Sequence, residues 1–384
     1  MKYKIAILTS HLIQYQTPFF KKIAKNQEID LMVYFYLNIG IGDDFFDPQF
    51  NKRIKWDIPL LEGYNYKFLG SRSFGIIKEI FNNSYDAIIV FGWSSFVSWL
   101  VFLTKPLHKT PIILRGESDL NKKIGFIKGF IKLIVLKILF KFTNAFLYSY
   151  SLNKEFYKFY GVPEKKLFFN PCAVDNERFI AASKELKSKN YELRKRLGIK
   201  KSDIVILFSG KLMERKRPMD LLKAFELLNS KFHILNSSLI FVGDGVLRQE
   251  LENYTKENNL KDVHFVGFKN QTEIPEYYAM ADIFVLPSEF DPSPKALNEA
   301  MNFGIPSIIT TGVGTGKDLI MENEGGFSYG VGDIGKLAEY LKIFAENLKL
   351  RKKMGGNSLK TVGQWNFEKG VRGIIAALDY LKLK

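Results

Sequence analysis

Asp291 and Glu299, two carboxylates eight residues apart, are well placed in this sequence for ligand chemistry. They lie in the stretch ADIFVLPSEFDPSPKALNEAMNFGIPSIITT, where the apolar runs 283–286 and 305–310 predict buried strands. Asp291 falls in the loop after the first strand, and Glu299 in a helical pattern between the two. Because open α/β sheets bind ligands beyond the carboxyl ends of their strands, this stretch predicts a crevice that holds both carboxylates.

Capping residues bound the helix between these strands. Ser293 is a favourable N-cap, Pro294 suits the first helical position and Gly304 suits the left-handed position after the end. We therefore expect a helix over about 294–303, whose free N-terminal amides attract phosphate.

A simpler interpretation of the same residues stays open. Glu299 could pair with Lys295 one turn earlier, and Asp291 could be an ordinary turn residue before Pro292.

Three more loops of the second half follow predicted strands. In FSGKLMERKRP, Gly210 permits a tight turn, and Lys211 and Lys216 stand where a diphosphate could bind, although Lys-rich loops are common. In FVGDGVLRQEL, Gly243 and Asp244 form a turn before a helix. Two interpretations stay open: the turn contacts a ligand, or it is a tight loop without a ligand. The loop after VHFVG, which includes Phe268, offers backbone groups to a nucleobase.

Alternating strands and helices predict an α/β fold with a doubly wound parallel sheet in each half. The charged stretch 180–201 is the expected boundary, which divides the chain into domains 1–180 and 181–366, and the amphipathic helix 367–384 completes the first domain. Residues 43–70 are aromatic and irregular, which suggests a long ordered excursion. The expected strands are 4–9, 30–36, 85–91, 111–114, 144–148 and 166–169 in the first half, and 204–208, 238–242, 263–266, 283–286 and 307–310 in the second.

The chain has 384 residues and a net charge of +16, which fits an anionic substrate, an anionic membrane surface or nucleic acid. Nucleic acid ranks last because the basic residues are dispersed and no nucleic-acid-binding signature is present. Cys172, the single cysteine, excludes an internal disulfide and a cysteine zinc site, and we expect it to be buried. No run is long enough for a signal peptide or a membrane span, so we expect a cytoplasmic protein.

Residues 122–142 (KKIGFIKGFIKLIVLKILFKF) combine apolar residues with lysines. At about 100° per residue, Lys128 and Lys132 fall on one side of a helix and Lys137 and Lys141 nearly opposite. Two interpretations remain open: a helix bound to an anionic membrane surface, peripheral at its inner face, or a helix that covers a sheet with extended lysines.

The motifs GKLMERKRPMDLLKAFELL, FVGDGVLRQEL, VHFVGF, ADIFVLPSEFDPSPKALNEAM and GIPSIIT, in this order, resemble the nucleotide-sugar domain of retaining glycosyltransferases of family 4. The resemblance extends over essentially the whole chain, including NPCAVDNERF before the expected hinge. It implies the GT-B fold of two facing Rossmann-like domains, a nucleoside diphosphate sugar as donor, and no metal.

The resemblance assigns roles to particular positions. Glu299 matches the family's carboxylate on the ribose, and Asp291 stands where a Glu usually contacts the sugar, with Glu289 as a substitute. Lys211 and Lys216 match the basic pair on the diphosphate, and backbone amides at Ser293 and Pro294 would face the sugar or phosphate.

The N-terminal half departs from the family. Arg115, with Glu117 nearby, replaces a frequent pocket histidine, and the loop SHLIQYQTP, with Ser10, His11 and Gln14, lacks the usual glycines.

The resemblance implies sugar transfer, with retention of configuration, to a hydroxyl of a glycan or lipid-linked acceptor in polysaccharide or lipopolysaccharide assembly. The alternatives are a nucleotide-sugar epimerase of the same fold and a non-catalytic glycan or membrane scaffold. A Rossmann oxidoreductase is disfavoured because no G-x-G-x-x-G follows the first strand.

Overall fold

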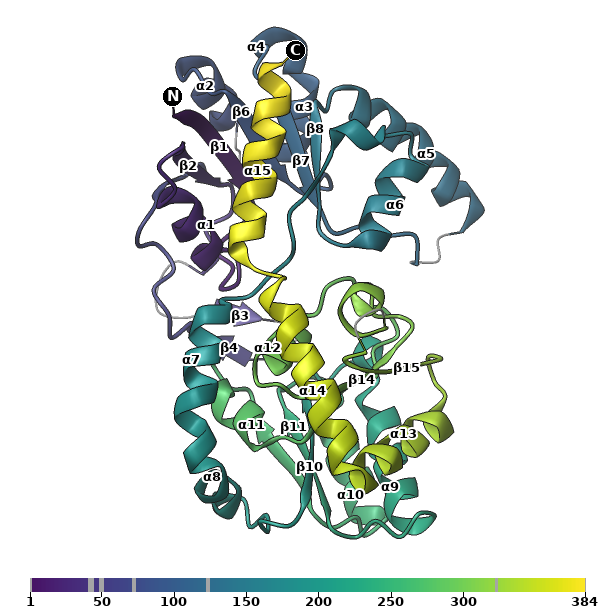
Figure 1. Ribbon diagram of the computed structural model, residues 1–384. Coiled ribbons are helices and arrows are strands. Elements are labelled where there is room, and N and C mark those ends of the chain that lie inside the picture. Colours follow the sequence, from purple (N-terminus) through teal and green to yellow (C-terminus); the bar gives the residue numbers. More distant parts are fainter. Residues whose placement is uncertain are drawn as a thin grey trace. The chain divides into compact units, whose positions relative to one another are not determined.

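A computed structural model describes residues 2–40, 45–47, 52–70, 74–121, 125–321 and 324–383 (Figure 1). The chain divides into two units. Unit 1 comprises residues 1–45, 59–172 and 366–384, and unit 2 comprises residues 46–58 and 173–365. The division differs from the expected one chiefly in residues 46–58, which precede most of unit 1 in sequence yet pack with unit 2.

Unit 1 contains a seven-stranded parallel sheet in the order β5-β2-β1-β6-β7-β8-β9. β5 was not predicted, because NYKF has no apolar run and its side chains are largely exposed at the edge of the sheet. The strands are β1 (Tyr3–Thr9), β2 (Ile29–Phe35), β5 (Asn65–Phe68), β6 (Ala87–Phe91), β7 (Ile112–Gly116), β8 (Ala145–Tyr148) and β9 (Leu167–Phe169).

The helices of unit 1 cover its sheet and leave a core of aliphatic and aromatic side chains. Apart from a short 3₁₀ turn at Glu164–Lys166, they are α1 (Thr17–Ala24), α2 (Gly75–Asn82), α3 (Phe96–Leu103), α4 (Lys105–His108), α5 (Phe126–Lys141), α6 (Ser151–Phe159) and the C-terminal α15 (Phe367–Lys382).

Unit 2 contains a six-stranded parallel sheet in the order β12-β11-β10-β13-β14-β15. β15 was not predicted in this sheet, because its sequence GFSY begins with glycine, a residue with low strand propensity. Gly326 is required there, because a Cβ would lie 1.8 Å from the Ser307 carbonyl oxygen on β14. The strands are β10 (Ile204–Ser209), β11 (Ser237–Val242), β12 (Val263–Gly267), β13 (Ile283–Leu286), β14 (Ser307–Thr310) and β15 (Gly326–Tyr329), with β3 (Phe45–Asp47) and β4 (Lys52–Ile54) forming a separate pair.

Helices also cover the sheet of unit 2 around its own core. They are α7 (Asn176–Leu186), α8 (Asn190–Arg196), α9 (Pro218–Ser230), α10 (Arg248–Glu257), α11 (Ile274–Met280), α12 (Lys295–Asn302), α13 (Ile334–Glu346) and α14 (Leu348–Gly363), with 3₁₀ turns at Lys187–Lys189 and Glu214–Lys216 and a π-helical turn at Lys317–Met321.

The two doubly wound parallel sheets confirm the predicted α/β fold. Their central strands are apolar runs buried on both faces, which is what parallel sheets covered by helices require.

The C-terminal helix α15 packs against β8, β9 and α1 and so completes unit 1 (Figure 1). Two glycines let it approach closely. A Cβ at Gly373 would lie 1.9 Å from the Phe169 carbonyl oxygen, and one at Gly370 would lie 2.8 Å from the Phe19 ring. The Asn170 side chain adds a hydrogen bond to the Gly370 carbonyl oxygen at 2.8 Å.

Replacing Gly373 tests this packing. We expect Gly373→Ala to destabilise the protein by about 1–3 kcal/mol, because the new methyl group meets backbone that cannot rotate away. Gly356→Ala in α14 is the matched control: open space surrounds that position, so the better helix former should stabilise by about 0.5–1 kcal/mol. Thermal and urea unfolding measure both changes, and equal stability of the two variants would contradict the packing.

Candidate functional site

The strand order of unit 2 reverses at β10. The chain runs from β10 outward to β11 and β12, and then returns to place β13 on the other side of β10. Loops that leave neighbouring strands in opposite directions open a crevice at this point, which is where ligands bind in doubly wound sheets. The loop after β10 carries Lys211 and Lys216, and the loop after β13 carries Asp291.

These two loops are joined by charged and backbone hydrogen bonds. The Lys216 ammonium donates to the Asp291 carboxylate, and both side chains are nearly buried. The Arg215 guanidinium donates to the Phe290 carbonyl oxygen, and the Glu289 amide donates to the Arg215 carbonyl oxygen at 2.9 Å. The structure therefore brings a predicted diphosphate residue and the predicted sugar residue into direct contact.

Lys211, the other predicted diphosphate residue, is held by a carboxylate from far away in sequence. Its ammonium donates to both oxygens of Asp47, at 3.0 and 3.2 Å. Asp47 belongs to the inserted segment, our name for residues 46–58, of which 48–51 lie outside the described residues. Parts of the excursion expected over 43–70 also fall outside them, and sequence reasoning did not connect Asp47 with this site.

The inserted segment is anchored beside the loop after β12. The Asp57 carboxylate accepts hydrogen bonds from the Gln271 amide at 3.2 Å and from the Thr272 amide at 2.9 Å. The rings of Trp56 and Phe268 have centroids 6.3 Å apart. Phe268, predicted near the nucleobase, thus has an aromatic neighbour from the inserted segment.

The turn after β11 is tight for a packing reason. A Cβ at Gly243 would lie 1.9 Å from the Gly210 carbonyl oxygen, and one at Gly245 would lie 2.4 Å from the Leu212 carbonyl oxygen. The Asp244 carboxylate accepts from Arg248 at 3.2 Å. Gly243 and Gly245 thus let the loops after β10 and β11 pack closely, which accounts for both glycines without a ligand. A contact between this turn and a ligand stays a prediction.

The start of α12 differs from the expectation. Its N-cap is Pro294, with no side-chain cap, and the helix begins at Lys295, so the prediction of Ser293 as N-cap is wrong. Proline already has the extended backbone that an N-cap position needs, whereas the Ser293 carbonyl oxygen accepts from the Lys295 ammonium at 3.1 Å. The end is as predicted, because Gly304 has φ +67° just after the Phe303 C-cap.

Glu299 is buried in α12, with 1% of its surface exposed. It accepts a hydrogen bond of 2.7 Å from the hydroxyl of Tyr278, a buried residue of α11. A carboxylate at this depth requires strong partners, and the Tyr278 hydroxyl is one of them.

A glycine-rich loop after β14 completes the crevice and was missed. The Asp291 amide donates to the Gly312 carbonyl oxygen at 3.0 Å, and the Gly314 amide donates to the Asp291 carbonyl oxygen at 2.9 Å. A Cβ at Gly312 would lie 2.1 Å from the Glu289 carbonyl oxygen. The signal in the sequence was TGVGTG directly after a predicted strand.

Arg115 and Glu117 follow β7 in unit 1. The buried Arg115 guanidinium donates to the Asn170 side chain at 2.7 Å and to Glu117 at 3.3 Å, and lies over the Phe91 ring at 4.9 Å. Burial by itself lowers the pKa of Arg115. The interactions of its guanidinium with Cys172 and Glu117 outweigh burial, so the pKa is raised. Cys172 is buried as expected, and its thiol donates to Glu117 at 2.8 Å.

The loop after β1 carries Ser10 and His11. Their side chains share a hydrogen bond of 2.9 Å between Ser10 Oγ and His11 Nδ1, and burial lowers the pKa of His11. Burial therefore favours the neutral form of the His11 imidazole, which suits hydrogen bonding rather than binding of an anion by charge.

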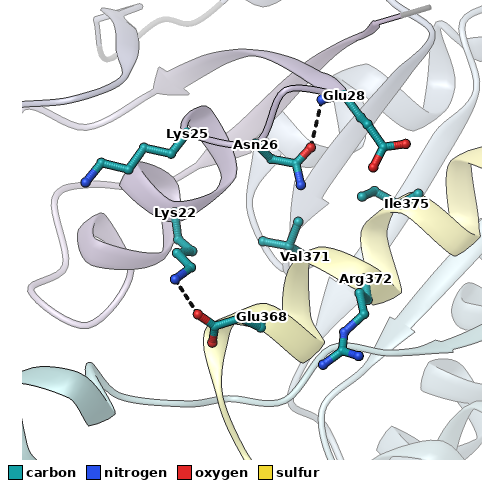
Figure 2. A pocket seen from close by; sticks show the side chains of 8 residues that line it. All are labelled: Lys22, Lys25, Asn26, Glu28, Glu368, Val371, Arg372 and Ile375. Atoms are coloured by element: carbon teal, nitrogen blue, oxygen red, sulfur yellow. Dashed lines mark hydrogen bonds and ion pairs between the residues drawn. The ribbon is translucent and has the colours of Figure 1, made fainter.

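A separate pocket of about 470 Å³ lies between α1 and α15 in unit 1 (Figure 2). Lys22 forms an ion pair with Glu368 at its edge. None of the predicted site residues lines it; the lining residues are Lys22, Lys25, Asn26, Glu28, Glu368, Val371, Arg372 and Ile375.

Within the ranges given above, no group of three or more His, Cys, Asp or Glu side chains is arranged to hold a metal ion. In the same part of the chain, no helix is both long and apolar enough to cross a membrane.

The part of the chain that carries this site is similar to known glycosyltransferases. Residues 189–361 match the model of glycosyl transferases group 1. An α-1,4-N-acetyl-D-galactosaminyltransferase of Campylobacter jejuni is 28% identical over 65% of this chain, and a UDP-Gal:α-D-GlcNAc-diphosphoundecaprenol α-1,3-galactosyltransferase of Escherichia coli is 27% identical over 64%. The chain spans 63% and 64% of the lengths of these two relatives.

Solved structures agree in fold. Anabaena HepE in complex with UDP and glucose superposes with a TM-score of 0.73 at 16% identity, over 98% of this chain and 99% of that one. WaaG, a glycosyltransferase of lipopolysaccharide biosynthesis, superposes with a TM-score of 0.65 at 14% identity, over 97% of this chain and 98% of that one. The whole chain therefore has the GT-B fold, and residues 189–361 carry its similarity to glycosyl transferases group 1.

Proposed function

We propose that the protein transfers a sugar from a nucleoside diphosphate sugar to a hydroxyl of a glycan or lipid-linked acceptor, with retention of anomeric configuration, in bacterial polysaccharide or lipopolysaccharide assembly. The observation that carries the proposal is the Lys216–Asp291 contact across the switch point of unit 2, beside Lys211 and the start of α12. An anionic diphosphate and a sugar hydroxyl are the ligands that such a set of groups recognises.

The relatives support this class of reaction. The names of the Campylobacter and Escherichia enzymes specify α-linked products and acceptors carried on diphosphoundecaprenol, and the second names UDP-galactose as donor. HepE binds UDP. Uridine nucleotides are therefore the first donors to test, and an α-linked product is the expected outcome.

The proposed mechanism is electrostatic. Cleavage of the bond between sugar and diphosphate leaves negative charge on the leaving phosphate, which Lys211, Lys216 and the N-terminal amides of α12 stabilise. Asp291 accepts hydrogen bonds from the sugar, and Glu299 from the ribose. Because these groups balance the diphosphate charge, we propose that no metal is required.

The inserted segment adds a step that is specific to this chain. The Lys211 ammonium is hydrogen-bonded to the Asp47 carboxylate. When the donor binds, its diphosphate therefore replaces Asp47 as the partner of Lys211. Lys216 is likewise shared between Asp291 and the incoming phosphate. We also propose that the reaction takes place in the cytoplasm, at the inner face of the membrane that carries the acceptor.

The test is a calorimetric titration of the whole chain with UDP, GDP and other nucleotides and their sugars, followed by product analysis. We expect one nucleoside diphosphate to bind, and its sugar to be transferred with retention in the presence of EDTA. Epimerised donor without added acceptor would instead establish the epimerase, and binding of no nucleotide would establish the scaffold. Loss of turnover in EDTA would refute only the metal-free mechanism.

Lys216→Ala should lower turnover by about 10²–10³-fold, because it removes one charged donor to the developing diphosphate. Uridine, which lacks phosphate, should bind the variant as it binds the wild type, whereas UDP should bind more weakly. Lys261→Ala, an exposed lysine before β12, is the control. A loss within about threefold would show that Lys216 serves only to pair Asp291.

Asp47→Asn should tighten UDP binding by about 2- to 5-fold, since the energy of a partly exposed ion pair no longer opposes the diphosphate. Titration of this variant beside Asp30→Asn, an exposed carboxylate of β2, measures the effect. Weaker binding would mean that Asp47 positions Lys211 for the donor rather than competing with it.

A further inference from the structure

The helix α5 exposes a large apolar surface in unit 1. None of its first ten residues is buried, and only Leu136, Leu139 and Phe140 near its C-terminal end reach the core. The exposed apolar side chains are Phe126, Ile127, Phe130, Ile131, Ile134 and Ile138, with exposed fractions between 46% and 90%.

These side chains form one face. At about 100° per residue, Ile127, Ile134 and Ile138 point almost directly away from the buried side, and Phe130 and Ile131 flank them. We call this set the outer face of α5. Globular proteins rarely leave such a continuous apolar surface in water unless it meets a partner or a membrane.

The inner side of α5 is accounted for by packing. The Phe140 ring lies 5.0 Å from that of Phe146 and 5.7 Å from that of Tyr157. The Lys132 ammonium lies 4.9 Å from the centre of the Phe156 ring on α6, so α5 and α6 lie side by side on one flank of unit 1 (Figure 1). Packing on the sheet and on α6 therefore accounts for the apolar residues on the inner side of α5. It does not account for the apolar residues of the outer face.

The charge around the outer face selects its partner. At the same 100° per residue, Lys137 and Lys141 fall among the apolar residues toward the C-terminal end of the outer face, and Lys128 falls to one side of it. All three are exposed, and the sequence has no Asp or Glu between Asp119 and Glu155. An apolar face whose charged neighbours on the helix are lysines matches an anionic lipid surface, where the apolar residues enter the acyl boundary and the ammonium groups meet headgroup phosphates.

The length of the helix fits the same surface. Sixteen residues span about 24 Å as a helix, too little to cross a bilayer but enough to lie along it. We propose that the outer face of α5 docks unit 1 on an anionic membrane surface. Docking itself does not depend on the proposed function. Its role does rest on the proposed function, because docking would bring the donor site to a lipid-linked acceptor.

Vesicle sedimentation with the whole chain tests the docking. Wild type should sediment with phosphatidylcholine vesicles that contain about one third phosphatidylglycerol, and much less with phosphatidylcholine alone. Phe130→Ser/Ile134→Ser should reduce this binding at least about tenfold, since both side chains leave the acyl boundary. Leu235→Ser/Leu348→Ser, which removes two exposed leucines of unit 2, should leave it unchanged.

Charge reversal provides an independent arm. Lys128→Glu/Lys137→Glu/Lys141→Glu should reduce binding to the anionic vesicles at least about 100-fold, at roughly 1 kcal/mol for each lysine. Lys349→Glu/Lys352→Glu/Lys360→Glu on α14, with the same change in net charge, should cost much less. Equal losses would show that net charge alone drives binding and would overturn the assignment to α5.

Two other results would also overturn it. One is wild type that binds neither kind of vesicle. The other is a wild-type dimer in light scattering that Phe130→Ser/Ile134→Ser converts to a monomer, because the outer face would then meet a second copy. UDP binding by the same variants separates the two proposals: a chain that docks but binds no nucleotide keeps the docking and loses the proposed function.

Discussion

The contact between Lys216 and Asp291 is the constraint on which the proposed donor site depends. It joins the loops after β10 and β13, two strands that are neighbours in space because the strand order reverses there. The backbone supports the contact from three sides, through the Arg215–Phe290 hydrogen bond, the Glu289 amide and the glycine loop around Gly312. Since both side chains are nearly buried, removing either one would leave the other charge without its partner.

Charge compensation continues along the whole basic loop. Lys211 meets Asp47, and Arg217 meets Asp220 at 2.6 Å, a hydrogen bond that raises the pKa of Arg217. A cluster of uncompensated cations would repel itself in a crevice of low dielectric constant. The protein therefore holds Lys211, Lys216 and Arg217 in place with carboxylates. In the proposed function, a donor diphosphate replaces carboxylates as partner of the two lysines. This arrangement gives Asp47, a residue of the inserted segment, influence over a site formed mostly by the second half of the chain.

Local patterns predicted the central strands well, because a strand buried on both faces needs an apolar run whatever surrounds it. The strands missed in the two large sheets, β5 and β15, are at the edges of those sheets, and neither is a buried apolar run. The prediction of Ser293 as N-cap was wrong because side-chain preference alone cannot decide between neighbouring positions. Serine is a suitable residue type, but the adjacent Pro294 has the extended backbone conformation of an N-cap and takes that position.

The sequence by itself determined the α/β fold, the order of the loops that meet at the crevice, and the residues that match the family, since strand periodicity and glycine turns are local properties. Tertiary structure decided which charges meet. Asp47 reaches Lys211 across 164 positions, and the buried Glu299 accepts a hydrogen bond from Tyr278 on a neighbouring helix. It also decided which side of α5 is covered. Lysines fall on two opposite sides of this helix, so its pattern does not predict which side is buried, and only packing against Phe146 and Tyr157 shows that the opposite side is left exposed.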